Sequence, residues 1–232
     1  MESRDPRVPD LRPGEMAVPV IDRRADVSAL AAATPTRIDV PEMVRTERMV
    51  LRPLLSIDRG PFLDLVRTNA AHLSPWVPIR DGDETEDAYF DRQLALCADG
   101  DANGSAWRRV GVLDDGQIVG MFNLNAITRG LSWEADAAWW LGRAFTGRGL
   151  ATEGVRTMLR HALEMAPAGL GLFAVHCGIA PENEVSRRLA ERCGFVHQPG
   201  KHSYLKVGGR WAYHEFFLCS GLPEDEPNRS VR

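Results

Sequence analysis

The chain has 232 residues, a length that suits one domain with appendages better than two full domains. Its 44% hydrophobic and 26% charged residues are ordinary for a globular protein that forms its core without disulfides or a metal. The formal net charge of -4 argues against a nucleic-acid-binding protein, because such domains usually carry a basic excess. No stretch is long and apolar enough to cross a bilayer, and we expect a cytoplasmic protein without a membrane partner.

The cysteine and histidine residues predict no metal site. Cys97, Cys177, Cys193 and Cys219 are widely spaced and form no C-x-x-C pair, which disfavours both zinc binding and a disulfide framework. No pair of histidines has the H-x-x-x-H spacing with acidic neighbours. Reduced thiols are the simplest interpretation.

Composition divides the chain into three segments. Residues 1–44 are rich in proline, which breaks helices, and only Val27–Ala33 has a helical pattern there. We interpret 1–44 as a flexible or draped extension, 45–220 as the folded domain, and 221–232 as a charged, frayed tail.

Regular patterns begin after the extension. Strands are predicted at Met49–Leu54, Trp107–Leu113, Gln117–Leu124, Ala135–Leu141, Leu172–Cys177, Leu205–Val207 and Trp211–Leu218. Helices are predicted at Pro61–Asn69, at Glu84–Cys97, from Leu150 to about Met165, and at Glu184–Arg192. This order predicts an α/β domain in which helices flank a mixed sheet.

The most informative segment joins a tryptophan-bearing strand to a long amphipathic helix through Gly147-Arg148-Gly149. The first N–H groups of a helix lack partners and lie at the positive end of its dipole, so they bind anions, and glycine lets a diphosphate approach. A G-x-G pattern alone fits equally well a tight turn that binds nothing. A P-loop is excluded because no lysine follows, and a dinucleotide fingerprint is excluded because Thr152 occupies the third glycine position.

Four segments resemble one family in the expected order. Thr146–Ala151 is similar to [QR]-x-x-G-x-[GA], and Asn183–Phe195 to N-x-x-S-x-x-L-x-E-x-x-G-F. Arg45–Pro53 is similar to a T-E-R-L-x-L-R-P opening, and His72–Pro78 to an H-L-x-x-W substrate loop. From about Thr46 to Leu218 the chain therefore resembles the GNAT acetyltransferases, in particular their RimJ/RimL-like group. The resemblance implies a GNAT-type mixed, mostly antiparallel central sheet with splayed strands flanked by helices.

The resemblance also implies acetyl-CoA as cosubstrate and no metal. The amides of Arg148–Thr152 would hold the diphosphate, and the backbone of Trp140 and Leu141 would pair with the pantetheine. Asn183 would bind the pantetheine, although a helix N-cap is an equal alternative. The implied cofactor-binding residues are Trp140, Leu141, Thr146, Arg148, Gly149, Leu150, Ala151, Thr152, Asn183 and Ser186. Thr146 departs from the arginine or glutamine that is usual there.

Candidate catalytic residues are two acids and one hydroxyl. Glu134 and Asp136 lie two apart, on one face of a strand, and either is a candidate general base. Solvated surface acids and a water-relayed base are the alternatives. Ala190 occupies the position of the tyrosine that many relatives use for the leaving thiolate, while Ser186 matches a RimL-type serine that donates to sulfur. That serine can instead bond back to its own helix.

The acceptor side is less defined. His72 and Trp76 are the candidate substrate contacts. Four acids are candidates for a wall that attracts a cation, or else belong to a solvated loop: Asp81, Asp83, Glu84 and Glu86.

The resulting functional prediction is an N-acetyltransferase that moves an acetyl group to a primary amine by direct attack in a ternary complex. The acceptor is a protein N-terminus or a small amine such as an aminated antibiotic. The alternative is a non-catalytic acyl-CoA-binding or regulatory module, since the tyrosine is missing and Thr146 departs from the pattern. A hydrolase that uses Ser74 with His72 is disfavoured because no G-x-S-x-G elbow is present. Analogy with the group also allows a homodimer.

Overall fold

The computed structural model describes residues 42–80, 83–207 and 210–221. Almost all of the expected extension 1–44 and tail 221–232 lies outside these ranges, as do the helix expected at Val27–Ala33 and residues 208–209 between two expected strands. The assignments of these segments stay predictions.

The described residues form a sheet of eight strands in the order β1-β2-β3-β4-β5-β6-β8-β7. The strands are β1 (Val44–Arg45), β2 (Met49–Arg52), β3 (Trp107–Leu113), β4 (Ile118–Thr128), β5 (Glu134–Leu141), β6 (Ala174–Ile179), β7 (Val196–Val207) and β8 (Arg210–Ser220). Every neighbouring pair is antiparallel except β5 and β6, which run parallel. The predicted mixed, mostly antiparallel sheet is confirmed.

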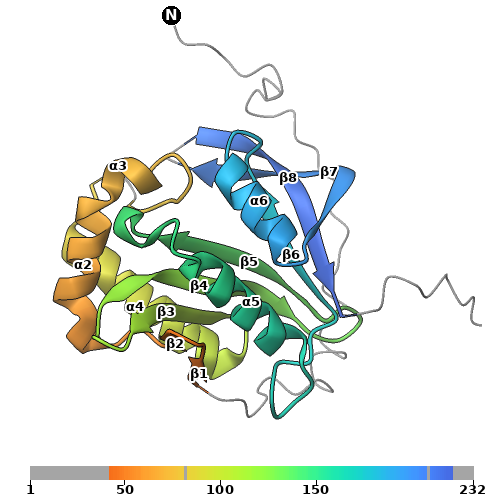
Figure 1. Ribbon diagram of the computed structural model, residues 1–232, viewed down its shortest axis with the longest axis horizontal. Helices are drawn as coiled ribbons and strands as arrows, with labels where there is room; N and C mark the ends of the chain where they lie inside the picture. Colours follow the sequence, from red (N-terminus) through yellow and green to blue (C-terminus); the bar gives the residue numbers. More distant parts are fainter. Residues whose placement is uncertain (1–41, 81–82, 208–209, 222–232) are drawn as a thin grey trace, which may run out of the picture.

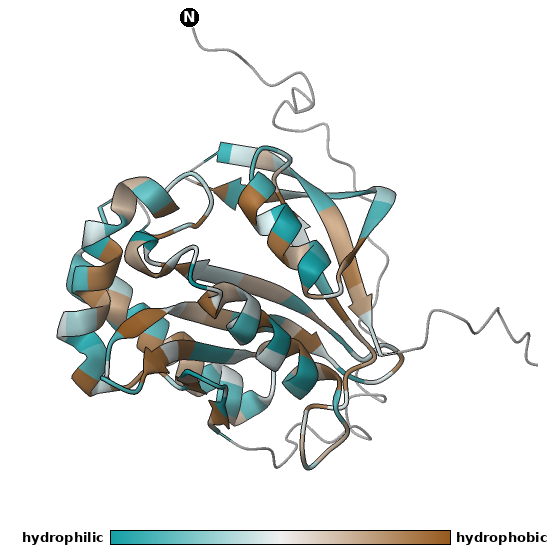
Figure 2. Cartoon of the chain, in the orientation of Figure 1, coloured by the Kyte–Doolittle hydropathy of each residue, from teal (hydrophilic) through white to brown (hydrophobic). Residues whose placement is uncertain are grey.

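Helices cover both faces of the sheet, as Figure 1 shows. They are α2 (Arg59–Thr68), α3 (Ala70–Leu73), α4 (Glu86–Asn103), α5 (Leu150–Leu163) and α6 (Glu184–Arg192), with short 3-10 turns η1 (Ser56–Asp58) and η2 (Arg143–Phe145). One apolar cluster joins α5 and α6 to the sheet, and a second joins α2 and α4 to its other face. We call these the α5/α6 face and the α2/α4 face. The helices alternate hydrophilic and hydrophobic stretches along their length in Figure 2, as amphipathic helices do.

The parallel pair separates after a short contact. Glu134, Ala135 and Asp136 of β5 pair with Ala174–His176 of β6. Beyond that point β5 continues beside β4 and β6 continues beside β8, so the two strands diverge (Figure 1). Their facing edges then carry main-chain groups without a strand partner. The predicted splay is confirmed, and we call the point of separation the fork.

Close packing places α5 directly against β4. A Cβ added to Gly154 would lie 2.3 Å from the ring of Phe122, a separation that no real side chain tolerates. Glycine at this position therefore lets the helix reach the sheet. Residues 142–149 join the end of β5 to α5, so this packing fixes the start of the helix near the end of β5, where β5 no longer pairs with β6.

Several element boundaries differ from the sequence prediction. Helix α4 runs past its predicted end at Cys97 to Asn103, and β4 runs past its predicted end at Leu124 to Thr128. The largest error concerns β7, which begins at Val196 although only Leu205–Val207 was predicted. Proline and glycine at residues 199–200 indicate a turn, but they lie within an edge strand at a register shift, where proline is tolerated.

Candidate functional site

The loop between β5 and α5 presents unpaired main-chain donors. Gly147 and Gly149 have left-handed φ angles of 72° and 81°, which glycine adopts without strain. Gly149 caps α5 without any side-chain hydrogen bond, and the first bond of the helix runs from Glu153 N to Gly149 O at 3.1 Å. No described residue accepts a hydrogen bond from the amides of Leu150, Ala151 or Thr152. These donors stand at the positive end of a 14-residue helix, an arrangement that suits a phosphate group.

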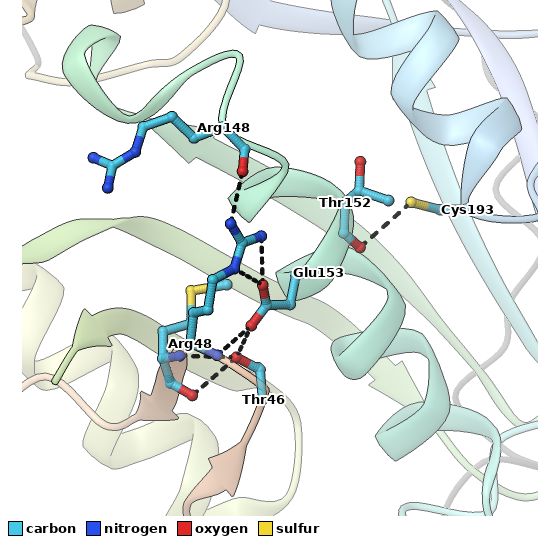
Figure 3. Close-up of polar contacts among 7 residues, drawn as sticks. Thr46, Arg48, Arg148, Thr152, Glu153 and Cys193 are labelled. Atoms are coloured by element: carbon cyan, nitrogen blue, oxygen red, sulfur yellow. Dashed lines mark hydrogen bonds and ion pairs between the residues drawn. The ribbon is translucent and has the colours of Figure 1, made fainter.

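A polar bridge fixes this loop to the start of the domain (Figure 3). Glu153, in the first turn of α5, accepts hydrogen bonds from the Thr46 hydroxyl and from the amide and Nε of Arg48, the latter two at 2.7 Å. Arg48 Nη1 donates to the carbonyl of Arg148 at 2.9 Å. The turn between β1 and β2 thereby holds both the helix and the glycine loop.

The bridge determines the ionisation of Glu153 and the space around Gly149. Burial alone would raise the pKa of Glu153, but the hydrogen bonds from Thr46 and Arg48 and the arginine charge lower it below its ordinary 4.5. A Cβ added to Gly149 would lie 3.2 Å from Arg48 Nη2. Sequence comparison marked the T-E-R segment only as a weak match and missed this role. The signal was present, since its partner Glu153 follows the glycine motif Thr146–Ala151 by two residues.

Side chains of the glycine loop have local partners. The Thr146 hydroxyl donates to the carbonyl of Arg143 at 2.8 Å. The Arg148 guanidinium lies 5.9 Å from the centre of the Phe145 ring, and the residue is exposed. Cofactor contacts by Thr146 and Arg148 stay predictions.

At the end of β5 the main-chain groups of Leu141 face the open edge, whereas those of Trp140 face β4. Gly142 N donates to Val119 O at 2.9 Å, and a Cβ on Gly120 would lie 2.0 Å from Trp140 O, so the main chain at both positions faces β4. Main-chain groups alternate along a strand, and those of Leu141 therefore face the open edge.

The two adjacent tryptophans lie on opposite faces of the sheet. Trp140 packs edge-on to Phe62 on the α2/α4 face, with ring centres 6.1 Å apart. Trp139 packs near Phe195 on the α5/α6 face, with ring centres 6.0 Å apart. The sequence alone did not show which tryptophan lies on which face of the sheet.

Helix α6 supplies the other two predicted residues. Asn183 Oδ1 accepts a hydrogen bond from Ser186 N at 3.2 Å and so caps the helix, which was the alternative for this residue. The Ser186 hydroxyl makes no hydrogen bond to a described residue, so it is not bonded back to its own helix. Ala190, at the position of the missing tyrosine, is fully buried in the core.

The two candidate bases differ in their surroundings. Glu134 Oε2 lies 2.8 Å from His176 Nε2, and this hydrogen bond lowers the pKa of Glu134. Asp136 lies beside His176 in register, and partial burial raises its pKa above the ordinary 3.8. Both acids project on the α2/α4 face at the fork. The surroundings of Asp136 therefore strengthen it as a proton acceptor, whereas those of Glu134 weaken it.

The predicted acceptor residues lie on the segment that follows α2. His72 lies in α3, and Trp76 is 38% exposed just beyond it. The preceding Asn69 accepts a hydrogen bond from Arg143 N at 2.7 Å, which joins this segment to the start of the glycine loop. Sequence analysis missed Asn69. Among the described residues no hydrogen bond or ion pair joins His72 or Trp76 to the acids at the fork, and their role stays a prediction.

The predicted acidic wall is partly neutralised by arginine. Glu84 accepts two hydrogen bonds of 2.7 Å from Arg92, and Glu86 lies 3.6 Å from Arg67. Asp81 falls outside the described residues. In the described ranges no three His, Cys, Asp or Glu side chains are grouped to hold a metal ion. Each helix of the described part is too short or too polar to span a bilayer.

Comparisons with known proteins agree with this geometry. The family described as Acetyltransferase (GNAT) domain matches residues 48–196. The chain is 25% identical over 196 residues to the [Ribosomal protein uS5]-alanine N-acetyltransferase of Escherichia coli K12, covering 83% of this chain and 98% of that protein.

Two solved structures share the fold. Mycobacterium smegmatis RimJ in complex with CoA-disulfide superposes with a TM-score of 0.69 at 24% identity, covering 80% of this chain and 90% of that one. The ribosomal-protein-S5-alanine acetyltransferase of Vibrio fischeri gives a TM-score of 0.67 at 22% identity, with 80% and 99% coverage.

Proposed function

This chain belongs to the GNAT acetyltransferase family, and we propose that it transfers the acetyl group of acetyl-CoA to the amino terminus of a protein. The unpaired amides at the start of α5, beside the open edge of β5, are the observation that carries the proposal. The relative from Escherichia coli is named for an alanine of ribosomal protein uS5, so a ribosomal-protein N-terminus is the first acceptor to test.

The residues present fit the cosubstrate. The amides of Leu150, Ala151 and Thr152 hold the diphosphate, and the left-handed Gly149 leaves room for it. The main chain at Leu141 pairs with the pantetheine along the open edge of β5. Acetyl-CoA would supply the acyl thioester, and Glu134 and Asp136 would meet it from the α2/α4 face at the fork.

Asp136 acts as the general base in this proposal. The incoming amine arrives as an ammonium ion and must lose a proton before it attacks. Asp136 has the raised pKa and projects at the fork, whereas Glu134 is occupied by its hydrogen bond with His176. Glu134 therefore serves to orient His176 beside the base.

Ser186 donates a hydrogen bond to the leaving thiolate. Its hydroxyl has no described partner and stands in the first turn of α6, a helix that begins just beyond the end of β6. Ala190 stands where many relatives carry a tyrosine for this role, and its buried methyl group cannot donate a hydrogen bond.

A thiol-release assay tests the proposal. Purified protein with acetyl-CoA is offered peptides that carry ribosomal-protein N-termini, and a parallel set of small amines, while free CoA is measured. We expect saturable turnover of at least one peptide and an acetylated product of the correct mass. Tight acetyl-CoA binding with an intact thioester in every case would instead favour the non-catalytic acyl-CoA-binding module, which the missing tyrosine motivates.

A further inference from the structure

Two consecutive arginines on β3 have contrasting surroundings. Arg109 is only 2% exposed, yet its charge is satisfied. Its Nη1 lies 3.0 Å from both carboxylate oxygens of Asp101, and its Nε donates to Glu42 O at 2.9 Å. Because side chains alternate along a strand, Arg108 projects onto the opposite face, the α2/α4 face, with Val110.

Arg108 has no such partner. Its side chain makes no hydrogen bond or ion pair to a described residue, and its Nε is buried. It lies near Cys97 and Arg92 of α4, and burial is the main cause that lowers its pKa. Arg92 is already bonded to Glu84 and adds repulsion. A partly buried cation without an anion is costly, which indicates that its partner comes from outside the chain.

A second unpaired group lies directly beside it. Asn123 of β4 is the register partner of Arg108 and is 9% exposed, and its Oδ1 is buried without a hydrogen-bond partner. The next residue across the sheet is Ala138 of β5, which is exposed and small. Asn125 repeats the pattern one step along β4, with a buried, unpartnered Oδ1 opposite Asp136. Unpaired polar groups therefore extend from Arg108 to the base at the fork.

We propose that Arg108 binds a carboxylate of the acceptor that lies close to its reacting amine, so that the enzyme prefers acidic N-termini. This inference rests on the proposed function. The guanidinium pairs with both carboxylate oxygens, and the unpartnered Asn123 Oδ1 accepts a hydrogen bond from an N–H of the acceptor beside that carboxylate. Arg108 and Asp136 stand two strands apart and two residues out of register, about 12 Å between their Cα atoms, which places the carboxylate within about two residues of the amine.

Matched peptides test the preference. Ala-Asp-Ala and Ala-Asn-Ala, both amidated at the carboxyl end, differ in one carboxylate. We expect the wild-type kcat/KM to favour the aspartate peptide by about tenfold, and Arg108→Gln to bring the ratio near one. Arg108→Lys keeps the positive charge but lacks the paired N–H donors of the guanidinium, so it should retain part of the preference. Arg45→Gln, a change of the same charge at an exposed residue of β1, leaves the ratio unchanged.

Peptide binding to the CoA-loaded protein, measured by calorimetry, separates the two proposals. Tighter binding of the aspartate peptide that Arg108→Gln abolishes supports the inference, even if no peptide is acetylated and the proposed function fails. Equal affinity and equal turnover of the two peptides by the wild type overturn the inference while leaving acetyl transfer intact. If Arg108→Gln does not fold, the wild-type ratio and the Arg108→Lys variant decide.

Discussion

The glycine loop at the end of β5 and the α2/α4 face at the fork are built on different principles. The loop presents main-chain donors, and its backbone is held by Arg48, which donates to the carbonyl of Arg148 and is bonded to Glu153. The α2/α4 face presents side chains from separate strands, among them Arg108, Asn123 and Asp136.

The difference shows how one enzyme divides two tasks. Diphosphate recognition needs only amides and a helix dipole, so a short stretch of chain contains nearly all of it. Acceptor recognition needs particular side chains, which come from positions far apart in the sequence. Substitutions in the loop should therefore change cosubstrate binding, and substitutions on the α2/α4 face should change catalysis and acceptor choice.

The largest effect is expected at Asp136, on the α2/α4 face. We expect Asp136→Asn to lower kcat about 100-fold with little change in the KM for acetyl-CoA, because the proton acceptor is lost. Wild-type activity should fall as the pH falls through the pKa of Asp136, which lies above 3.8, and the variant should lose this limb of the profile. Steady-state kinetics across pH measure both effects.

Glu134→Gln is the matched control for Asp136. It removes a charge from the same face of the same strand, two residues away, and should cost less than about fivefold in kcat. An equal loss in both variants would show that charge at the fork, and not proton transfer by Asp136, supports catalysis.

The next largest effect concerns the loop. We expect Gly149→Ala to raise the KM for acetyl-CoA about tenfold, because alanine is strained at a φ of 81° and its Cβ would press on Arg48. Gly116→Ala is the control, since its φ is 86° and nothing lies within 4 Å of the added Cβ in the β3–β4 hairpin. Melting temperatures with and without CoA report affinity independently. If Gly116→Ala loses as much CoA affinity as Gly149→Ala, general backbone strain and not the phosphate site explains the loss.

The smallest effect concerns the bridge to β1 and β2. Glu153→Gln weakens charged hydrogen bonds from Arg48, and we expect it to cost about 1–2 kcal/mol of stability and to raise the KM for acetyl-CoA about threefold. The pKa of Glu153 is depressed in the folded state, so its contribution is present above about pH 4.5 and is lost as the pH falls through the folded-state pKa.

Denaturation curves at a series of pH values from 7 downward check this sign, since the stability difference between the wild type and Glu153→Gln should shrink as the pH falls below about 4.5. Glu164→Gln, an exposed change at the C-cap of the same helix, is the control. A change in acceptor preference in Glu153→Gln would contradict the assignment of cosubstrate binding to the glycine loop and of acceptor choice to the α2/α4 face.

The sequence predicted most of the fold because most elements have strong local patterns. Helix α5 and strand β3 combine clear periodicity with turn signals at their ends, and α5 differs from its prediction only at its last residues. The start of β7 was missed because residues 199–200 indicate a turn locally, while pairing with β8 carries the strand through them. Tertiary pairing overrides local propensity at such an edge.

The site was predictable only in part, for a similar reason. The donors of Leu150–Thr152 follow from a contiguous motif, and the structure shows them without partners at the start of α5, while their contact with a diphosphate stays a prediction. Arg48 and Asn69 escaped notice because their partners, Glu153 and Arg143, lie about a hundred and about seventy residues away. Arg108 was unremarkable in the sequence beside Arg109, since only the packed structure shows which of the two lacks an anion.

The narrow contact between β5 and β6 links ligand occupancy to the integrity of the whole molecule. Strands β1–β5 and β6–β8 form two half-sheets whose ladder is continuous only at three register positions. A pantetheine arm bound between the diverging strands would supply the missing main-chain hydrogen bonds and join the two half-sheets into one cooperative unit. Acetyl-CoA binding would then also stabilise the fold. We expect the two half-sheets to separate most readily in the enzyme without ligand.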